Sequence, residues 1–99
     1  MADRYYLCVS SAGPARDMSR GTREQPHRDD HAAFVDRLVA EGRAVLGGPL
    51  VDEGGAVLVL RGTDERATRE LLAADPWYVH GVLRLDAVKR WDLYINELP

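Results

Sequence analysis

Two titratable side chains, His31 and Asp75, occupy positions that suggest chemistry. His31 shares a helical spacing with the apolar residues Phe34 and Leu38, and an imidazole can take or give a proton near neutral pH. Asp75 directly precedes Pro76 at the end of a helical segment, where the negative end of the helix dipole disfavours a carboxylate. Both residues also have a structural interpretation, because a histidine can belong to the core and an Asp-Pro pair can begin a short turn.

A metal site is the next possibility that the histidines raise. His27 and His31 are four residues apart (HRDDH), a spacing that can place two imidazoles on one metal ion. The zinc-protease helix with this spacing needs a glutamate directly after the first histidine, and Arg28 stands there. A third ligand exists only if Asp75 or His80 converges on the pair. Because GxGxxG, P-loop and GxSxG motifs are also missing from the sequence, we expect no metal and no cofactor.

Other residues could line a cavity around the histidine. Tyr78 and His80 follow the Asp-Pro pair and could offer a phenol hydroxyl and a second imidazole, although packing under the sheet edge is the favoured interpretation of Trp77 and Tyr78. Gly47 and Gly48 either let backbone N–H groups approach a ligand oxygen or form a bulge beside a proline. The candidate ligand-contacting residues are therefore Ser10, Gly47, Gly48, Pro49, Tyr78 and His80.

The segment Ser11–Gln25 is expected to be a long loop, since it has two glycines, one proline and no apolar periodicity. Loops of this length often act as lids over a site. Arg16, Arg20 and Arg23 give the loop a positive bias and could clamp a carboxylate or a phenolate. A solvated charged loop is the commoner explanation for such arginines.

Composition limits the class of protein. The chain has 99 residues, 45% hydrophobic and 29% charged, as expected for one globular domain over residues 1–99. A net charge of -3 gives no sign of a nucleic-acid or membrane partner. The only cysteine, Cys8, lies in an apolar segment, which favours a core position over a reactive thiol. No apolar run has the length of a transmembrane helix, and Met1–Ser10 lacks the apolar stretch of a signal peptide, so we expect a cytoplasmic protein.

Hydrophobic patterning predicts four strands joined by two helices. The strands are expected at Arg4–Ser10, Ala44–Val51, Ala56–Arg61 and Val82–Trp91. The first helix should run from Pro26 to about Glu41, where Gly42 ends it. The second helix should take Thr63 as its N-cap and stop before Pro76.

The second helix and the tail complete this prediction. The helix is expected to bury Ala67, Leu71 and Ala74 along one stripe, and a further short turn should follow at Trp77–Gly81. The tail Asp92–Pro99 contains too many apolar residues for a free solvated end, Leu98 among them.

The order βαββαβ predicts an α+β fold of the ferredoxin-like type, an antiparallel sheet with two helices on one face. A sheet covered on one side alternates apolar with polar residues. The first strand does not: Tyr5, Leu7 and Val9 point one way, and Tyr6 and Cys8 point the other. We therefore expect a second copy of the chain to cover the open face, which gives a homodimeric α/β barrel.

Two segments resemble the signatures of the YciI-like (YCII-related) domain family. His31–Leu50 (HAAFVDRLVAEGRAVLGGPL) resembles a helix that opens with histidine, ends in EGR and leads into a strand carrying GP. Ala73–Val82 (AADPWYVHGV) resembles the second signature, an Asp-Pro pair that ends the second helix. The resemblance covers Tyr5 to Trp91. It implies a dimeric α/β barrel, shared in outline with muconolactone isomerases and small cofactor-free monooxygenases.

The resemblance also implies an active site with a His–Asp pair, carried onto His31 and Asp75. The best-defined chemistry of the family is the elimination of HCl from a chlorinated hydroxyhydroquinone. Because the loop Ser11–Gln25 is longer than in minimal members, the substrate class does not carry over.

These observations give a first hypothesis and two alternatives. The first is a cofactor-independent lyase or isomerase acting on an oxygenated aromatic or lactone-like molecule, with His31 as general acid/base and Asp75 orienting its ring. The Gly47–Gly48 backbone and Tyr78 would position a substrate oxygen. The alternatives are a non-catalytic small-ligand-binding or accessory protein that uses the same cavity, and a purely structural dimer module.

Overall fold

The strands and helices follow the predicted order, with a short 3-10 turn added in the long loop. The computed structural model describes residues 4–97. The strands are β1 (Arg4–Ala12), β2 (Ala44–Pro49), β3 (Ala56–Gly62) and β4 (Leu83–Trp91), whose ends differ from the predicted ones by at most two residues. The helices are α1 (Arg28–Ala40), α2 (Glu65–Leu72) and the one-turn α3 (Pro76–Val79), and the 3-10 turn η1 covers Thr22–Glu24.

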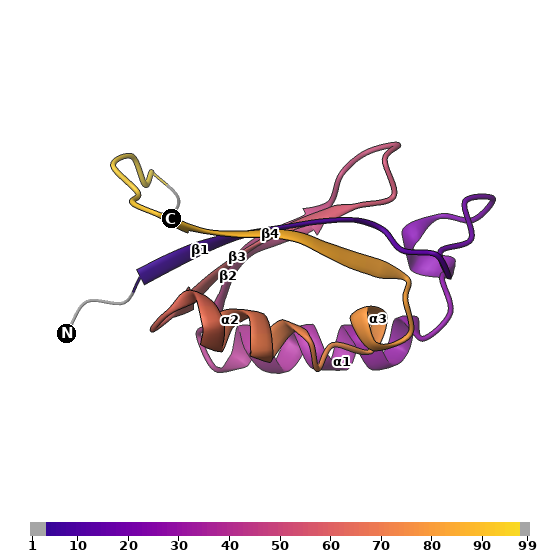
Figure 1. Cartoon of the computed structure of the whole chain (residues 1–99), viewed down its shortest axis with the longest axis horizontal. Helices are drawn as coiled ribbons and strands as arrows, with labels where there is room; N and C mark the ends of the chain where they lie inside the picture. The colour runs from indigo at the N-terminus through magenta and orange to yellow at the C-terminus, as the bar shows by residue number, and fades with distance from the viewer. Residues whose placement is uncertain (1–3, 98–99) are drawn as a thin grey trace.

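The strands form one antiparallel sheet in the order β2-β3-β1-β4, with the helices packed against one face (Figure 1). In β1, the buried side chains of Tyr6 and Cys8 belong to the core between sheet and helices. The same core contains Phe34 and Leu38 of α1 and Leu72 of α2. This is the α+β, ferredoxin-like arrangement that the sequence predicted.

The other face of the sheet has no helix over it in the part of the chain that the structure describes (Figure 1). Leu7 and Val9 of β1 and Val57 of β3 alternate with the core residues, so they point to this open face. All three are only half-buried. Both faces of the central strands are therefore apolar, as expected.

Helix α1 begins at Arg28, two residues later than predicted. The reason is tertiary: the backbone carbonyl of Pro26 accepts a hydrogen bond from the Trp77 indole at 2.8 Å, and His27 takes a left-handed backbone conformation with φ 61°. The helix therefore starts only after His27. Its end agrees with the prediction, since Gly42 follows with φ 75°.

Helix α2 corrects two predictions. Its N-cap is Asp64 instead of Thr63, because the Asp64 carboxylate accepts a hydrogen bond from the Ala67 N–H at 2.7 Å. The fully buried residues are Thr68 and Leu72, one position along from the predicted stripe. Of that stripe, Leu71 packs half-buried against the core as predicted, whereas Ala67 and Ala74 are exposed. Thr68 tolerates burial because its hydroxyl donates to the Asp64 carbonyl at 2.9 Å.

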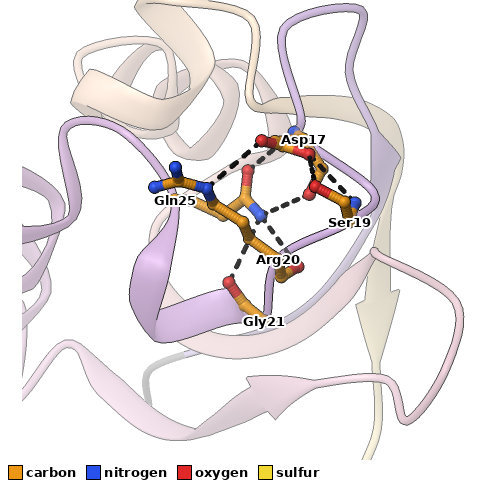
Figure 2. Close-up of polar contacts among 5 residues, drawn as sticks. All are labelled: Asp17, Ser19, Arg20, Gly21 and Gln25. Atoms are coloured by element: carbon orange, nitrogen blue, oxygen red, sulfur yellow. Dashed lines mark hydrogen bonds and ion pairs between the residues drawn. The ribbon is translucent and has the colours of Figure 1, made fainter.

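The long loop is ordered around one buried side chain, Gln25, which is only 3% exposed (Figure 2). Its amide nitrogen donates to the carbonyls of Asp17, Arg20 and Gly21 at 2.8, 3.1 and 3.2 Å, and its amide oxygen accepts from the Asp17 N–H at 2.9 Å. The loop lies beside α3 and the start of α1 (Figure 1). Its role as a lid stays a prediction.

The segment after β4 projects Tyr94 and Ile95 outward, with 94% and 82% of their surfaces exposed. Leu98, which belongs to the predicted apolar tail, lies outside the described residues. Within residues 4–97, no helix combines the length and the apolar character that crossing a bilayer requires.

Candidate functional site

His31 and Asp75 are hydrogen-bonded to each other. His31 lies in the first turn of α1, and Asp75 is the N-cap of α3. The His31 Nδ1 atom is 2.9 Å from both carboxylate oxygens of Asp75. One of these oxygens also accepts a hydrogen bond from the Trp77 backbone N–H at 2.9 Å. Asp75 is therefore both a helix cap and a partner of the histidine, so the two interpretations of this residue are compatible.

The orientation of the imidazole plane of His31 is fixed as well as the direction of its Nδ1 atom. Its ring stacks on the Trp77 indole with a centroid separation of 3.7 Å and an interplanar angle of 9°. The indole is in turn anchored through its N–H to the Pro26 carbonyl. The sequence favours simple packing for Trp77, and that interpretation misses its contact with His31. Its position two residues after Asp75, on the same short turn, was the available signal.

The contact with Asp75 determines which ring nitrogen of His31 can react. An ionised carboxylate can accept a hydrogen bond but has no proton to donate. In the neutral ring, Nδ1 of His31 therefore carries the N–H. The lone pair then belongs to Nε2. Asp75 is buried, whereas 20% of the His31 side chain remains exposed. The ring can therefore meet a ligand while its partner is shielded from water.

His31 lines a cavity of about 420 Å³ on the helix-covered side of the sheet, a volume within the usual range of small-molecule sites. Of the predicted ligand-contacting residues, the wall contains Ser10, Gly47, Gly48, Pro49 and Tyr78. Asp75 and Trp77 line it too. Most of the remaining surface is aliphatic, from residues such as Val35, Val45 and Leu58. The cavity thus combines apolar walls with a few polar groups.

Helix α1 contributes a stripe of its own to this wall, beside the stripe that faces the core. The cavity stripe consists of Arg28, His31, Ala32, Val35, Asp36 and Val39. Arg28 and Asp36 were missed as wall residues, although Arg28 lies three residues before His31 and so shares its side of the helix.

Two polar groups of the cavity wall have defined partners. Ser10 is buried, and its hydroxyl donates to the Ala56 carbonyl at 3.2 Å. Burial raises the pKa of the Tyr78 phenol, an effect that a hydrogen bond with Ser10 opposes and the nearby Asp75 charge reinforces. Tyr78 is therefore a neutral hydroxyl at physiological pH and can donate a hydrogen bond to a ligand oxygen.

Cys8 also lines the cavity. Burial raises the pKa of its thiol to about 11, so the nucleophilic thiolate is scarce near neutral pH. The expected core position is confirmed, because Cys8 belongs to the main hydrophobic cluster.

The structure places no strand bulge at Gly47 and Gly48, although a bulge was one interpretation of this pair. The register shift in β2 falls between Ala44 and Leu46, ahead of both glycines. A Cβ atom at Gly47 would meet the Leu58 side chain at 2.6 Å, whereas one at Gly48 would meet nothing within 4 Å. A side chain at Gly47 would therefore require the end of the Leu58 side chain to move, while Gly48 has open space around it.

His80 lies outside the cavity wall. It is exposed and stacks on His27, with ring centroids 3.7 Å apart and an interplanar angle of 9°. Parallel rings at this distance do not converge their nitrogens on one metal ion. Within residues 4–97, no group of three or more His, Cys, Asp or Glu side chains is arranged to hold a metal.

The loop arginines separate into two kinds. Arg16 and Arg23 line the cavity, and Arg20 does not. Arg20 instead pairs with Asp17 at 3.4 Å, and the pKa of that carboxyl is lowered by the hydrogen bond from the Ser19 hydroxyl. Spacing in the sequence gives no means to separate these arginines.

Comparison with known proteins identifies the family of the chain. The family model of the YCII-related domain matches residues 5–92. Uncharacterized protein YjpA of Bacillus subtilis (strain 168) is 35% identical over 69 residues, which cover 70% of this chain and 80% of the relative. The family match spans β1 to β4 and includes His31 and Asp75. The chain belongs to the YCII-related domain family.

Proposed function

We propose that the protein is a cofactor-independent enzyme of the lyase or isomerase type, acting on an oxygenated aromatic or lactone-like small molecule. The observation that carries this proposal is the His31–Asp75 hydrogen bond at the wall of a cavity of about 420 Å³. A histidine whose Nδ1 is bound to a buried carboxylate and whose ring faces a cavity has the arrangement of a general base.

In this mechanism the Nε2 atom of His31 takes a proton from a C–H or O–H group of the substrate. Asp75 stabilises the resulting imidazolium, which is also stacked on Trp77. Tyr78 donates a hydrogen bond to the oxygen on which negative charge develops. In an isomerisation the imidazolium returns the proton to another atom of the substrate. In an elimination the electron pair expels a leaving group, such as chloride, and the proton leaves later to water.

The experiment that tests the proposal detects abstraction of a carbon-bound proton whatever product is formed, and it detects turnover by the change of the substrate signals. Hydroxylated aromatics and lactones are incubated with the protein in D₂O, and loss of C–H signals is followed by proton NMR. We expect exchange or turnover for at least one class, lowered about 10²–10⁴-fold in His31→Gln. His80→Gln is the matched control, because His80 does not line the cavity, and it should retain wild-type rates.

Binding without exchange or turnover would favour the non-catalytic alternative. The largely aliphatic wall supports that alternative as far as ligand binding is concerned, since apolar cavities bind small molecules without chemistry. If the protein neither binds nor converts these compounds, the purely structural dimer module is the remaining hypothesis.

We also propose that the protein forms a homodimer in the cytoplasm. The apolar face of the sheet, including Leu7, Val9 and Val57, is the surface that a second copy would cover. His31 and Asp75 lie on the other side of the sheet, so each protomer would hold its own complete pair. A single cysteine, which cannot form an internal disulfide, fits a reducing compartment.

A further inference from the structure

One charged group at the cavity has unused hydrogen-bonding capacity. The Nε atom of Arg16 is buried and has no hydrogen-bond partner among residues 4–97. The Arg16 Nη2 atom donates to the Thr22 hydroxyl at 3.3 Å, a long bond. Arg16 and Thr22 both line the cavity that contains His31.

A buried donor without a partner opposes folding, and the effect is larger for a charged group. Such groups persist where they serve another purpose. The Nε atom is too buried to meet a ligand itself, but Arg16 as a whole lines the cavity and brings its positive charge there. The two Nη nitrogens of a guanidinium group carry parallel N–H bonds that match the two oxygens of a carboxylate, and among the described residues the only side-chain bond of Nη2 in Arg16 is the long one to Thr22.

The position of Arg16 is set by the backbone around it. Its side chain lies against Gly54, in the β2–β3 connection, where an added Cβ would be 3.1 Å from Nε and 3.2 Å from Cδ. The chain just before Arg16 is tied to the start of β4, because the Gly13 N–H donates to the Val82 carbonyl at 2.9 Å. The Gln25 network holds the chain just after it (Figure 2). Arg16 is thus placed before any ligand arrives.

The charges nearby reinforce an anion site. Arg23 and Arg28 line the same cavity, although Arg28 is partly engaged with Asp29 at 3.3 Å. The acidic wall residues are Asp75, which is bonded to His31, and the exposed Asp36.

We propose that Arg16 recognises a carboxylate on the ligand, so that the cavity takes a small carboxylic acid with an apolar, aromatic or lactone body. This inference rests on the proposed function only in that it needs the cavity to be a ligand site. It assigns recognition to the loop and proton transfer to His31.

The test compares binding of benzoate with binding of its neutral analogue, benzamide, by NMR chemical-shift titration. Wild-type protein should bind benzoate more tightly. Arg16→Ala should weaken benzoate binding about 10–100-fold, the effect of losing a hydrogen bond to a charged group, and change benzamide binding less than about twofold. Arg16→Lys, which keeps the charge and loses the planar fork, should be intermediate. Arg20→Ala is the matched control in the same loop and should bind benzoate as wild type does.

A second measurement separates recognition from a structural role. If Arg16 serves the ligand, Arg16→Ala removes an unpartnered buried donor, so its unliganded melting temperature should equal or exceed that of wild type. A lowered melting temperature with unchanged benzoate affinity would overturn the inference. Equal binding of benzoate and benzamide by wild type and Arg16→Ala would overturn it while leaving the proposed function intact. Failure of both probes to bind would count against the inference and against the ligand cavity itself.

Discussion

The contact between His31 and Asp75 should be measurable as a coupling free energy in unfolding. The useful substitution at position 75 is Asp75→Asn, because asparagine caps a helix about as well as aspartate and so preserves the bond to the Trp77 N–H. Asp75→Ala would lose this cap as well, adding about 1 kcal/mol unrelated to His31. His31→Ala combined with Asp75→Asn therefore gives a double-mutant cycle centred on the pair.

The structure sets the expected size. The carboxylate is buried and the imidazole mostly buried, with both oxygens 2.9 Å from Nδ1, so solvent screens the contact little. Hydrogen bonds to charged groups contribute about 1.5–3 kcal/mol, and an asparagine carbonyl retains part of that. We expect a coupling free energy of about 1–2 kcal/mol, within the range for contacting residues.

The assay is urea unfolding of the wild type, the two single variants and the double variant. Protein concentration must be the same throughout, since association with a second copy would raise apparent stability. The dependence of unfolding free energy on urea should stay constant across the four proteins, which shows that each unfolds from a similarly compact state. Additivity of the two single effects to within about 0.3–0.5 kcal/mol would refute the pairing and remove the basis of the proposed mechanism.

Three further predictions concern the loop, the core and the open face. Gly13→Ala should destabilise the protein by about 1–3 kcal/mol in thermal unfolding, because the new Cβ would overlap the Gly81 carbonyl oxygen; Gly21→Ala, with open space around it, should be nearly neutral. Burial raises the pKa of Cys8 from 9.0 to about 11, so between these values the native protein keeps a proton that the unfolded chain loses. Stability should therefore fall as the pH rises through this window, by up to about 2–3 kcal/mol, and comparison with Cys8→Ala in urea titrations should isolate that loss. Leu7→Glu should shift the protein toward monomer in light-scattering chromatography, because it places a charge on the apolar open face; an unchanged mass would contradict the proposed interface.

The order of the strands and helices was predictable because apolar periodicity reports which faces are buried. What failed were features decided by contacts distant in sequence. Nothing near Pro26 indicates that an indole fifty-one residues later will hold its carbonyl and delay the start of α1. In α2 the predicted stripe favoured alanines, but Thr68 is buried because its hydroxyl is satisfied inside its own helix.

The candidate site shows the same division. His31 and Asp75 were identifiable from the helical spacing and from the family resemblance, and the structure brings them into contact. His80 was grouped with Tyr78 on proximity in the chain, yet one helical turn is enough to direct Tyr78 into the cavity and His80 toward His27. Side-chain direction on so short an element depends on its docking, which no local pattern records.

Helix α3 connects several parts of the site, so one substitution in this segment can affect more than one of them. Together with its N-cap, it supplies the partner of the histidine, the ring on which the imidazole stacks and the phenol of Tyr78. A one-turn helix has little stability of its own, so the cap by Asp75 and the indole bond to Pro26 must hold it in place. Changes at Asp75 that remove the cap therefore disturb the scaffold and the proposed chemistry together. His31 contacts that scaffold only through its ring, so substitutions at His31 give the cleaner test of whether the cavity performs chemistry.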